Sequence, residues 1–289
     1  MIARAPAAGW CVLTAAACLA AVGPLAAQLG FAVLAVGVIG MAHGASDLAI
    51  VAPARRPAFL AAYAAVSLLC LAWWITRPAL ALPLFLGASA VHFAMEDAPQ
   101  GSWRERALRG MSLIATPATL HPAQLHMLLH VAAGGDAVSS AIIAVMATIG
   151  GIAAAVLIAT GVARRDPRLV GGTMALLLFP PLIGFALGFL ILHALPQTSV
   201  RRARIGCATM SGYLRATAPI MAAAIAVFAL VTTIVLRFDD SGIRGLFAAI
   251  AALAMPHLLV TPWFTEKAHA LTKHTMRGHI AIDSLSQYH

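Results

Sequence analysis

Residues 37–48 read GVIGMAHGASDL and place a histidine, His43, and an acid, Asp47, inside an apolar run long enough to cross a bilayer. Ionisable groups at bilayer depth cost roughly 2.5 to 3.5 kcal/mol or more each on insertion scales, so they usually mark chemistry, an ion path or a ligand. Three more histidines, His92, His193 and His257, lie in comparable apolar positions. We therefore expect the fold to gather these four side chains at one site.

The composition predicts an integral membrane protein. Of the 289 residues, 61% are hydrophobic and only 10% are charged, and the mean hydropathy of +0.90 is too high for a water-soluble domain of this size. The net charge of +9 comes from Lys and Arg in short connections between apolar runs, which is typical of a membrane protein and does not indicate a nucleic-acid partner. The four cysteines show no C-x-x-C spacing, so we expect neither a disulfide framework nor a thiolate metal site.

The apolar runs predict an all-α, polytopic transmembrane helix bundle with about eight spans, forming a single domain over residues 1–264, with a polar tail over 265–289. The expected spans are Trp10 to Gln28, Gly30 to Val51, Ala58 to Ile75, Ala79 to Met95, Val138 to Val162, Leu169 to Leu195 with a kink near Pro180-Pro181, Ala216 to Leu236, and Ile243 to Leu259. The first run also fits a secretory signal, because Arg4 precedes it and small residues end it. A retained span fits the charge distribution at least as well.

One segment, Ala107 to Ala133, is divided by Pro117 and Pro122, so we expect two short helices that dip into the membrane or lie on it without crossing. If the segment does not cross, most of the 19 Lys and Arg residues lie on the side of the N-terminus, which the positive-inside rule then places in the cytoplasm. In that topology the four histidine-bearing spans all run in the same direction. A crossing segment would divide the histidines between the two faces.

The four histidines suit a metal site, because imidazole is the usual nitrogen ligand for iron, copper and zinc. A ligating histidine normally donates its other N–H to a carboxylate or carbonyl. Asp47 lies four residues after His43, and Glu96 and Asp97 lie four and five residues after His92, so we expect each acid to orient the ring one turn before it. One histidine at a helix end more simply bonds a carbonyl, but four on one side of the membrane favour a shared site.

The other histidines and the aromatic residues point less clearly to a site. His126 and His130 form an i, i+4 pair that suits a metal, but beside a proline-broken amphipathic stretch we favour an interfacial role. We expect no catalytic role for three histidines of the polar tail: His269, His274 and His279. Several aromatic side chains either line an apolar tunnel or serve as packing and interfacial anchors: Trp73, Trp74, Phe85, Phe93, Phe179, Phe185, Phe189, Trp263 and Phe264.

Five short motifs occur in order between about residues 37 and 264. They are His43-Gly44-x-x-Asp47; Val91-His92-Phe93 with Asp97 behind it; Arg109-Gly110 leading to Pro117 and His121-Pro122; His193-Ala194-Leu195; and Pro256-His257-Leu258-Leu259-Val260. Together they resemble the Brp/Blh family of membrane β-carotene 15,15′-dioxygenases.

The resemblance implies a catalytic domain that uses Fe(II), held by histidines, and O₂ as co-substrate to split the central double bond of β-carotene into two retinals. It implies His43, His92 and His193 as iron ligands with His257 as the fourth, and aromatic residues around the polyene. Asp47 and Asp97 would orient the rings. It also implies a carotenoid substrate dissolved in the lipid bilayer, a bacterial inner-membrane location, and a retinal-binding opsin as downstream partner.

This chain departs from the family at two positions. Members usually carry a second histidine four residues after the one matching His193, whereas here that position is Gln197, whose carbonyl can also coordinate, so we include it among the cofactor-binding candidates. Ala94 stands where the family tends to have glycine. Two other hypotheses remain open: a b-type haem protein with two of the four histidines as axial ligands, and a transporter or binding protein whose buried histidines and acids relay protons.

Overall fold

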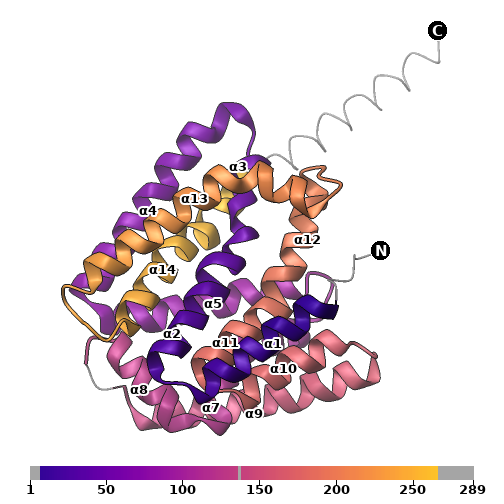
Figure 1. Ribbon diagram of the computed structural model, residues 1–289, viewed down its shortest axis with the longest axis vertical. Coiled ribbons are helices and arrows are strands. Elements are labelled where there is room, and N and C mark those ends of the chain that lie inside the picture. Colours follow the sequence, from indigo (N-terminus) through magenta and orange to yellow (C-terminus); the bar gives the residue numbers. More distant parts are fainter. Residues whose placement is uncertain (1–6, 136–137, 266–289) are drawn as a thin grey trace.

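The computed structural model describes residues 7–135 and 138–265, and this part of the chain is helical without strands (Figure 1). The expected all-α class is therefore confirmed. Seven helical stretches are long and apolar enough to cross a membrane: Leu25–Ile50, Pro53–Thr76, Pro78–Asp97, Ser140–Ala163, Pro181–Arg204, Met210–Val235 and Ile243–Thr265. Apart from Thr265, the expected polar tail lies outside the described residues.

The helices follow one another with short connections. In chain order they are α1 (Ala7–Val22), α2 (Leu25–Leu34), η1 (Ala35–Ile39), η2 (Gly40–Ala42), η3 (Gly44–Ser46), α3 (Asp47–Ile50), η4 (Pro53–Arg55), α4 (Arg56–Thr76), α5 (Pro78–Asp97), α6 (Trp103–Ala115), α7 (Pro117–Leu120), α8 (Pro122–Ala132), α9 (Ser140–Ala163), α10 (Pro167–Leu178), α11 (Pro181–Phe189), η5 (Leu190–Ala194), α12 (Leu195–Arg204), α13 (Met210–Val235) and α14 (Ile243–Leu259).

The first expected span is shorter than predicted. Helix α1 has 16 residues and ends at Val22, because Gly23 and Pro24 follow and a proline cannot continue the hydrogen-bond ladder of the helix before it. Helix α2 then begins at Leu25 with Pro24 as its N-cap. The N-terminal apolar region thus contributes the short helix α1 and the longer stretch Leu25–Ile50, which is long enough to cross a membrane.

The expected kinked span from Leu169 to Leu195 is instead two helices that fold back on each other. Helix α10 ends at Leu178, and α11 begins at Pro181 with Pro180 as its N-cap, because the two prolines cannot continue α10. Two glycines allow the pair to pack closely, since a Cβ at Gly172 would lie 2.5 Å from Leu192 Cγ and one at Gly188 would lie 2.5 Å from Leu176 Cγ. These pairings run in opposite directions along the two helices. The prediction of one kinked span was therefore wrong, and α10 lies antiparallel to the run α11–α12.

The proline-broken segment also differs from the expectation. It forms three short helices, α6, α7 and α8, and its two ends lie at opposite ends of α5. Near its start, Arg106 Nε donates to the carbonyl of Ala98 at 3.0 Å. After its end, a Cβ at Gly134 would lie 2.7 Å from Pro78 Cγ. The segment therefore leads the chain back along the whole of α5.

Helix α9 then runs antiparallel to α6. Thr116 Oγ1 donates to the carbonyl of Gly150 at 3.2 Å, and Arg164 at the far end of α9 donates to Glu105 Oε1 at 2.7 Å. This hydrogen bond from Arg164 lowers the pKa of Glu105 below its ordinary value.

The return along α5 and the fold-back of α10 add two reversals to the expected path. Consequently the four histidine-bearing runs still point in the same direction.

We expect Gly110→Ala to lower the melting temperature of the detergent-purified protein. Helices α5 and α6 approach so closely that a Cβ at Gly110 would collide with the main-chain oxygen of Ala90, and such overpacking costs about 1 to 3 kcal/mol. The control is Gly87→Ala, because no atom lies within 4 Å of that Cβ position. Alanine in place of a helical glycine otherwise stabilises by roughly 0.5–1 kcal/mol. Equal melting temperatures for the two variants would contradict the packing described here.

Candidate metal centre

The four histidines expected to share a site lie together as a closed ring of imidazoles. Neighbouring ring centroids are 5.0 Å apart for His43 and His193, 5.3 Å for His193 and His92, 5.1 Å for His92 and His257, and 5.3 Å for His257 and His43. His43, His193 and His257 are buried, and His92 is half-buried. The residues come from four separate elements: the η2–η3 connection, α5, η5 and α14. We call this group the histidine cluster.

Two of these histidines lie where the helix geometry is irregular. His43 follows the π-helix η1 and the 3-10 helix η2, and His193 lies within the π-helix η5. Such turns often occur at functional sites. The glycine at position 40 lets η2 approach the end of α11, just before η5, because a Cβ there would lie 2.6 Å from Phe189 Cε1. Tyr213 donates its hydroxyl hydrogen to the carbonyl of Ala42 at 2.5 Å, which satisfies a main-chain group inside this irregular segment.

Three of the four rings are held through Nδ1. The acceptors are two carboxylates and one main-chain carbonyl: Asp97 Oδ1 for His193 at 2.8 Å, Asp47 Oδ2 for His257 at 2.5 Å, and the Gly40 oxygen for His43 at 2.5 Å. A ring that donates from Nδ1 keeps the lone pair on Nε2 for a metal. The arrangement is the one that metal-ligating histidines use.

Three ring nitrogens of the cluster lack a hydrogen bond among the described residues. The Nε2 atoms of His92, His193 and His257 are buried and make no hydrogen bond within the described part of the chain. Buried polar atoms are nearly always satisfied, because an unpaired one is destabilising. A bound metal ion would satisfy such nitrogens, and the ligand atoms of His92 and His193 lie within 4.8 Å of each other, so the chemistry of the residues present fits a metal site.

The acids orient rings of other helices, which corrects the expected pairing. Asp47 was expected to orient His43 and instead accepts from His257, and Asp97 accepts from His193. In both cases the ring lies on a neighbouring helix, although the acid lies about one turn after a histidine of its own chain segment. The role predicted for these acids, orienting a ring, matches the contacts, but the partners were wrong.

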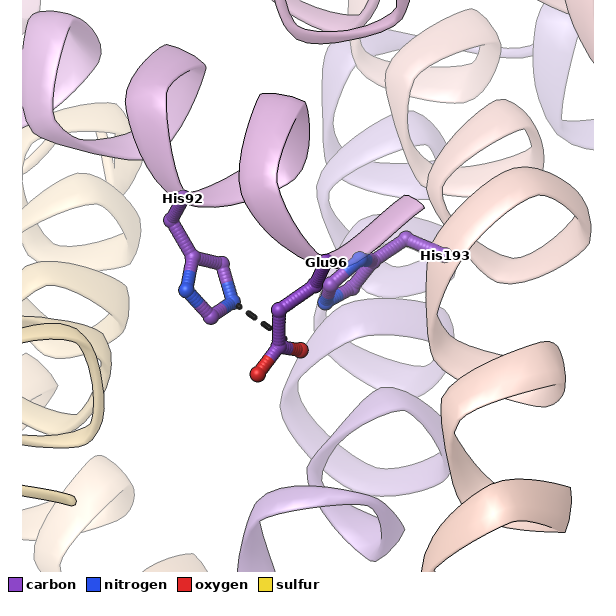
Figure 2. A group of neighbouring side chains, drawn as sticks. All are labelled: His92, Glu96 and His193. Atoms are coloured by element: carbon purple, nitrogen blue, oxygen red, sulfur yellow. Dashed lines mark ion pairs between the residues drawn. The ribbon is translucent and has the colours of Figure 1, made fainter. Parts of the chain in front are cut away.

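A third acid joins the cluster. Ligand atoms of His92, Glu96 and His193 lie within 4.8 Å of one another (Figure 2), and Glu96 Oε2 lies 3.6 Å from His92 Nε2. This carboxylate oxygen has no hydrogen-bond partner among the described residues. From the sequence, Glu96 was expected only to orient the ring of His92. Its place one helical turn after that histidine was the signal that could have suggested a ligand.

Arg201, on α12, connects two of the acids and was missed by the sequence analysis. It is 6% exposed and donates to Asp47 Oδ1 at 3.1 Å and to Glu96 Oε1 at 3.2 Å. Among the described residues it is the one guanidinium that forms a salt bridge with any of the three cluster acids, and it does so with Asp47 and Glu96 but not with Asp97. Arg201 therefore compensates part of the negative charge of these buried acids.

The remaining candidates bond main-chain carbonyls. Gln197 donates its side-chain N–H to the carbonyl of Glu96 at 2.9 Å, which leaves the side-chain carbonyl as the group that could coordinate. His126 Nε2 donates to the carbonyl of Val138 at 2.7 Å, and His121 Nε2 donates to that of Leu178 at 3.1 Å. His126 and His121 thus bond main-chain groups outside the cluster, and the interfacial role favoured for His126 stays a prediction.

An apolar cavity of about 660 Å³ reaches the histidine cluster, and all four histidines line it. This volume is typical of sites that enclose an organic ligand. Four of the nine aromatic residues singled out from the sequence line the cavity: Phe85, Phe93, Phe185 and Phe189. Four aromatic residues that the sequence analysis did not single out do so as well: Phe59, Tyr63, Phe228 and Phe247.

The fold and the site define a class of protein: a helical, membrane-embedded bundle with a histidine-and-carboxylate centre at the wall of a large apolar cavity. The family model described as beta-carotene 15,15′-dioxygenase matches residues 34–265. Since the match covers most of the chain and includes every histidine of the cluster, the protein belongs to this family. Searches among curated proteins and among solved structures gave no match.

We expect Asp97→Asn to lower the affinity of the purified protein for divalent metal by about 10- to 100-fold, the usual effect of losing the group that orients a ligating histidine. The amide no longer offers His193 a charged acceptor. Bound metal after dialysis against graded chelator gives the measurement. Asp166→Asn is the matched control, because Asp166 caps α10 by accepting from Leu169 N and asparagine caps equally well. Equal metal affinity in both variants would argue against a metal at the cluster.

Proposed function

We propose that the protein cleaves the central double bond of β-carotene with O₂ at an Fe(II) ion held by His43, His92, His193 and His257. Family membership supports a dioxygenase acting on a carotenoid. The choice of ligands is supported by one observation above the others: four imidazoles form a ring at the wall of an apolar cavity, and three of their buried Nε2 atoms make no hydrogen bond among the described residues. Glu96 is a further candidate ligand, because its free carboxylate oxygen lies beside two of these rings.

The donor set suits ferrous iron. Neutral imidazoles leave the positive charge on the ion, and a carboxylate beside them is a common companion in non-haem iron sites. When bound, the iron supplies the electron transfer that lets O₂ react with a closed-shell polyene. Imidazole nitrogens also bind copper and zinc, so the assignment of iron rests on the family.

The polar residues around the cluster act by holding the rings still. Asp47 and Asp97 accept the Nδ1 protons of His257 and His193, which fixes the tautomer and leaves both Nε2 atoms available as ligands. Arg201 holds Asp47 and Glu96 in turn. In this proposal these contacts hold the ligands in place before the substrate binds.

The apolar cavity suits the other half of the reaction. One O₂ places one oxygen atom on each carbon of the broken double bond and yields two aldehydes, so the reaction needs neither an external reductant nor a proton from the protein. The chain therefore has to position a hydrocarbon and exclude water, which an apolar wall with aromatic side chains achieves.

We further propose a location in a bacterial inner membrane with a cytoplasmic N-terminus, and a retinal-binding opsin as recipient of the product.

Expression in β-carotene-producing cells tests this proposal. The wild-type protein should bleach the cells and form retinal, and His43→Ala should reduce retinal formation by more than about 100-fold through loss of a ligand. Extracted pigments and retinal are measured by chromatography. His126→Ala is the control, since this histidine bonds a carbonyl outside the cluster, and it should behave as wild type. Unchanged pigment in cells that contain well-folded wild-type protein would refute the proposal.

A further inference from the structure

The cavity at the histidine cluster meets the outside of the bundle along two helices. Six of its lining residues are exposed, and among the described residues that line it they occur on α4 and α13 only: Leu60, Ala64, Leu68, Ala223, Val227 and Leu230. Exposure reaches 66% at Leu68 and 59% at Leu230. Lining residues of the other elements are buried or half-buried. We call these six the rim residues.

The rim residues form one stripe on each helix. On α4 they follow the spacing i, i+4, i+8, and on α13 they follow i, i+4, i+7, so each set lies on a single helical face. Helix α14 packs against both helices: Tyr63 donates to the carbonyl of Leu253 at 2.9 Å, and a Cβ at Gly245 would lie 3.3 Å from Thr232 Cγ2. Figure 1 shows α4, α13 and α14 grouped on one side of the molecule. The opening therefore lies between α4 and α13, with α14 behind it.

The opening lies at membrane depth. Both stripes occupy the middle of helices that are long and apolar enough to cross a bilayer, Pro53–Thr76 and Met210–Val235. Their side chains are leucine, alanine and valine, which expose no polar group. The opening thus faces lipid tails, where a water-soluble compound would not be found.

The other end of the cavity is closed. Its wall on the side of α8 consists of Leu125, Leu128 and Leu129, which are 7%, 4% and 4% exposed. Buried Leu182 of α11 adds to this wall. The cavity is therefore a pocket with an open end in the lipid and a closed end inside the bundle.

We propose that the opening between α4 and α13 is the entrance through which a long apolar polyene passes from the bilayer, end first, to the histidine cluster. The inference rests on the proposed function and adds the route and the manner of binding. The rim residues would exclude molecules with a polar head group, because nothing on either stripe can replace the hydrogen bonds that such a group makes in water.

Two substitutions at the rim test the entrance. Ala64→Phe on α4 and Ala223→Phe on α13 should narrow it and lower kcat/KM for β-carotene supplied in liposomes by about tenfold or more. The controls are Ala65→Phe and Ala222→Phe, which lie next to the rim positions, are also exposed, and do not line the cavity. The series Ala64→Val, Leu and Phe should lower kcat/KM step by step, whereas loss of folding would appear as a fall in melting temperature instead.

The experiment distinguishes failure of the proposed entrance from failure of the proposed reaction. If the wild-type protein forms retinal and the rim variants match the controls, the opening is not the entrance and holds a lipid tail instead. If the wild-type protein forms no retinal, the entrance is tested by binding instead. The carotenoid that co-purifies with each variant is then measured by its absorbance. Loss of pigment from the rim variants alone supports the entrance, whereas equal retention overturns it. Absence of pigment from every variant overturns both proposals.

Discussion

A carboxylate buried between membrane-spanning helices is the constraint on which the rest of the structure depends. Asp47 is 2% exposed, and it accepts hydrogen bonds from His257, from Thr261 at 2.8 Å and from Arg201. A charge without water has to be paired and hydrogen-bonded. Three parts of the chain, α3, α12 and the end of α14, must therefore meet at this residue. By meeting there they also fix one ring of the histidine cluster and, through Arg201, the position of Glu96.

The sequence predicted the bundle and the four histidines because both depend on one strong signal, ionisable residues within apolar runs. The expected path of the chain between them was less accurate. The segment around Pro117 and Pro122 runs the whole length of α5, and Pro180-Pro181 separates two antiparallel helices. Each difference reverses the direction of the chain once. The two reversals cancel, so the parallel alignment of the histidine-bearing helices was predicted from a path that differs in two places.

The contacts between helices could not be read from the sequence. Spacing along one helix shows that Asp47 lies a turn beyond His43, but the partner of a side chain depends on how neighbouring helices pack and on the irregular turns of η1, η2 and η5. For the same reason Arg201 was interpreted as part of a basic connection, and Phe59 and Phe228 were not recognised as cavity residues. Hydropathy identifies which residues are buried in protein or lipid. It does not identify which of them face each other.

A pocket with one open end also sets an order for product release. Under the proposed function and entrance, cleavage near the middle of a polyene would leave two fragments in line, one toward the leucines of α8 and one toward the gap between α4 and α13. The inner aldehyde would then lie behind the outer one and could depart only after it. The two products, although chemically identical for a symmetric substrate, would then leave at different times, and the slower departure would limit how soon the next molecule can bind.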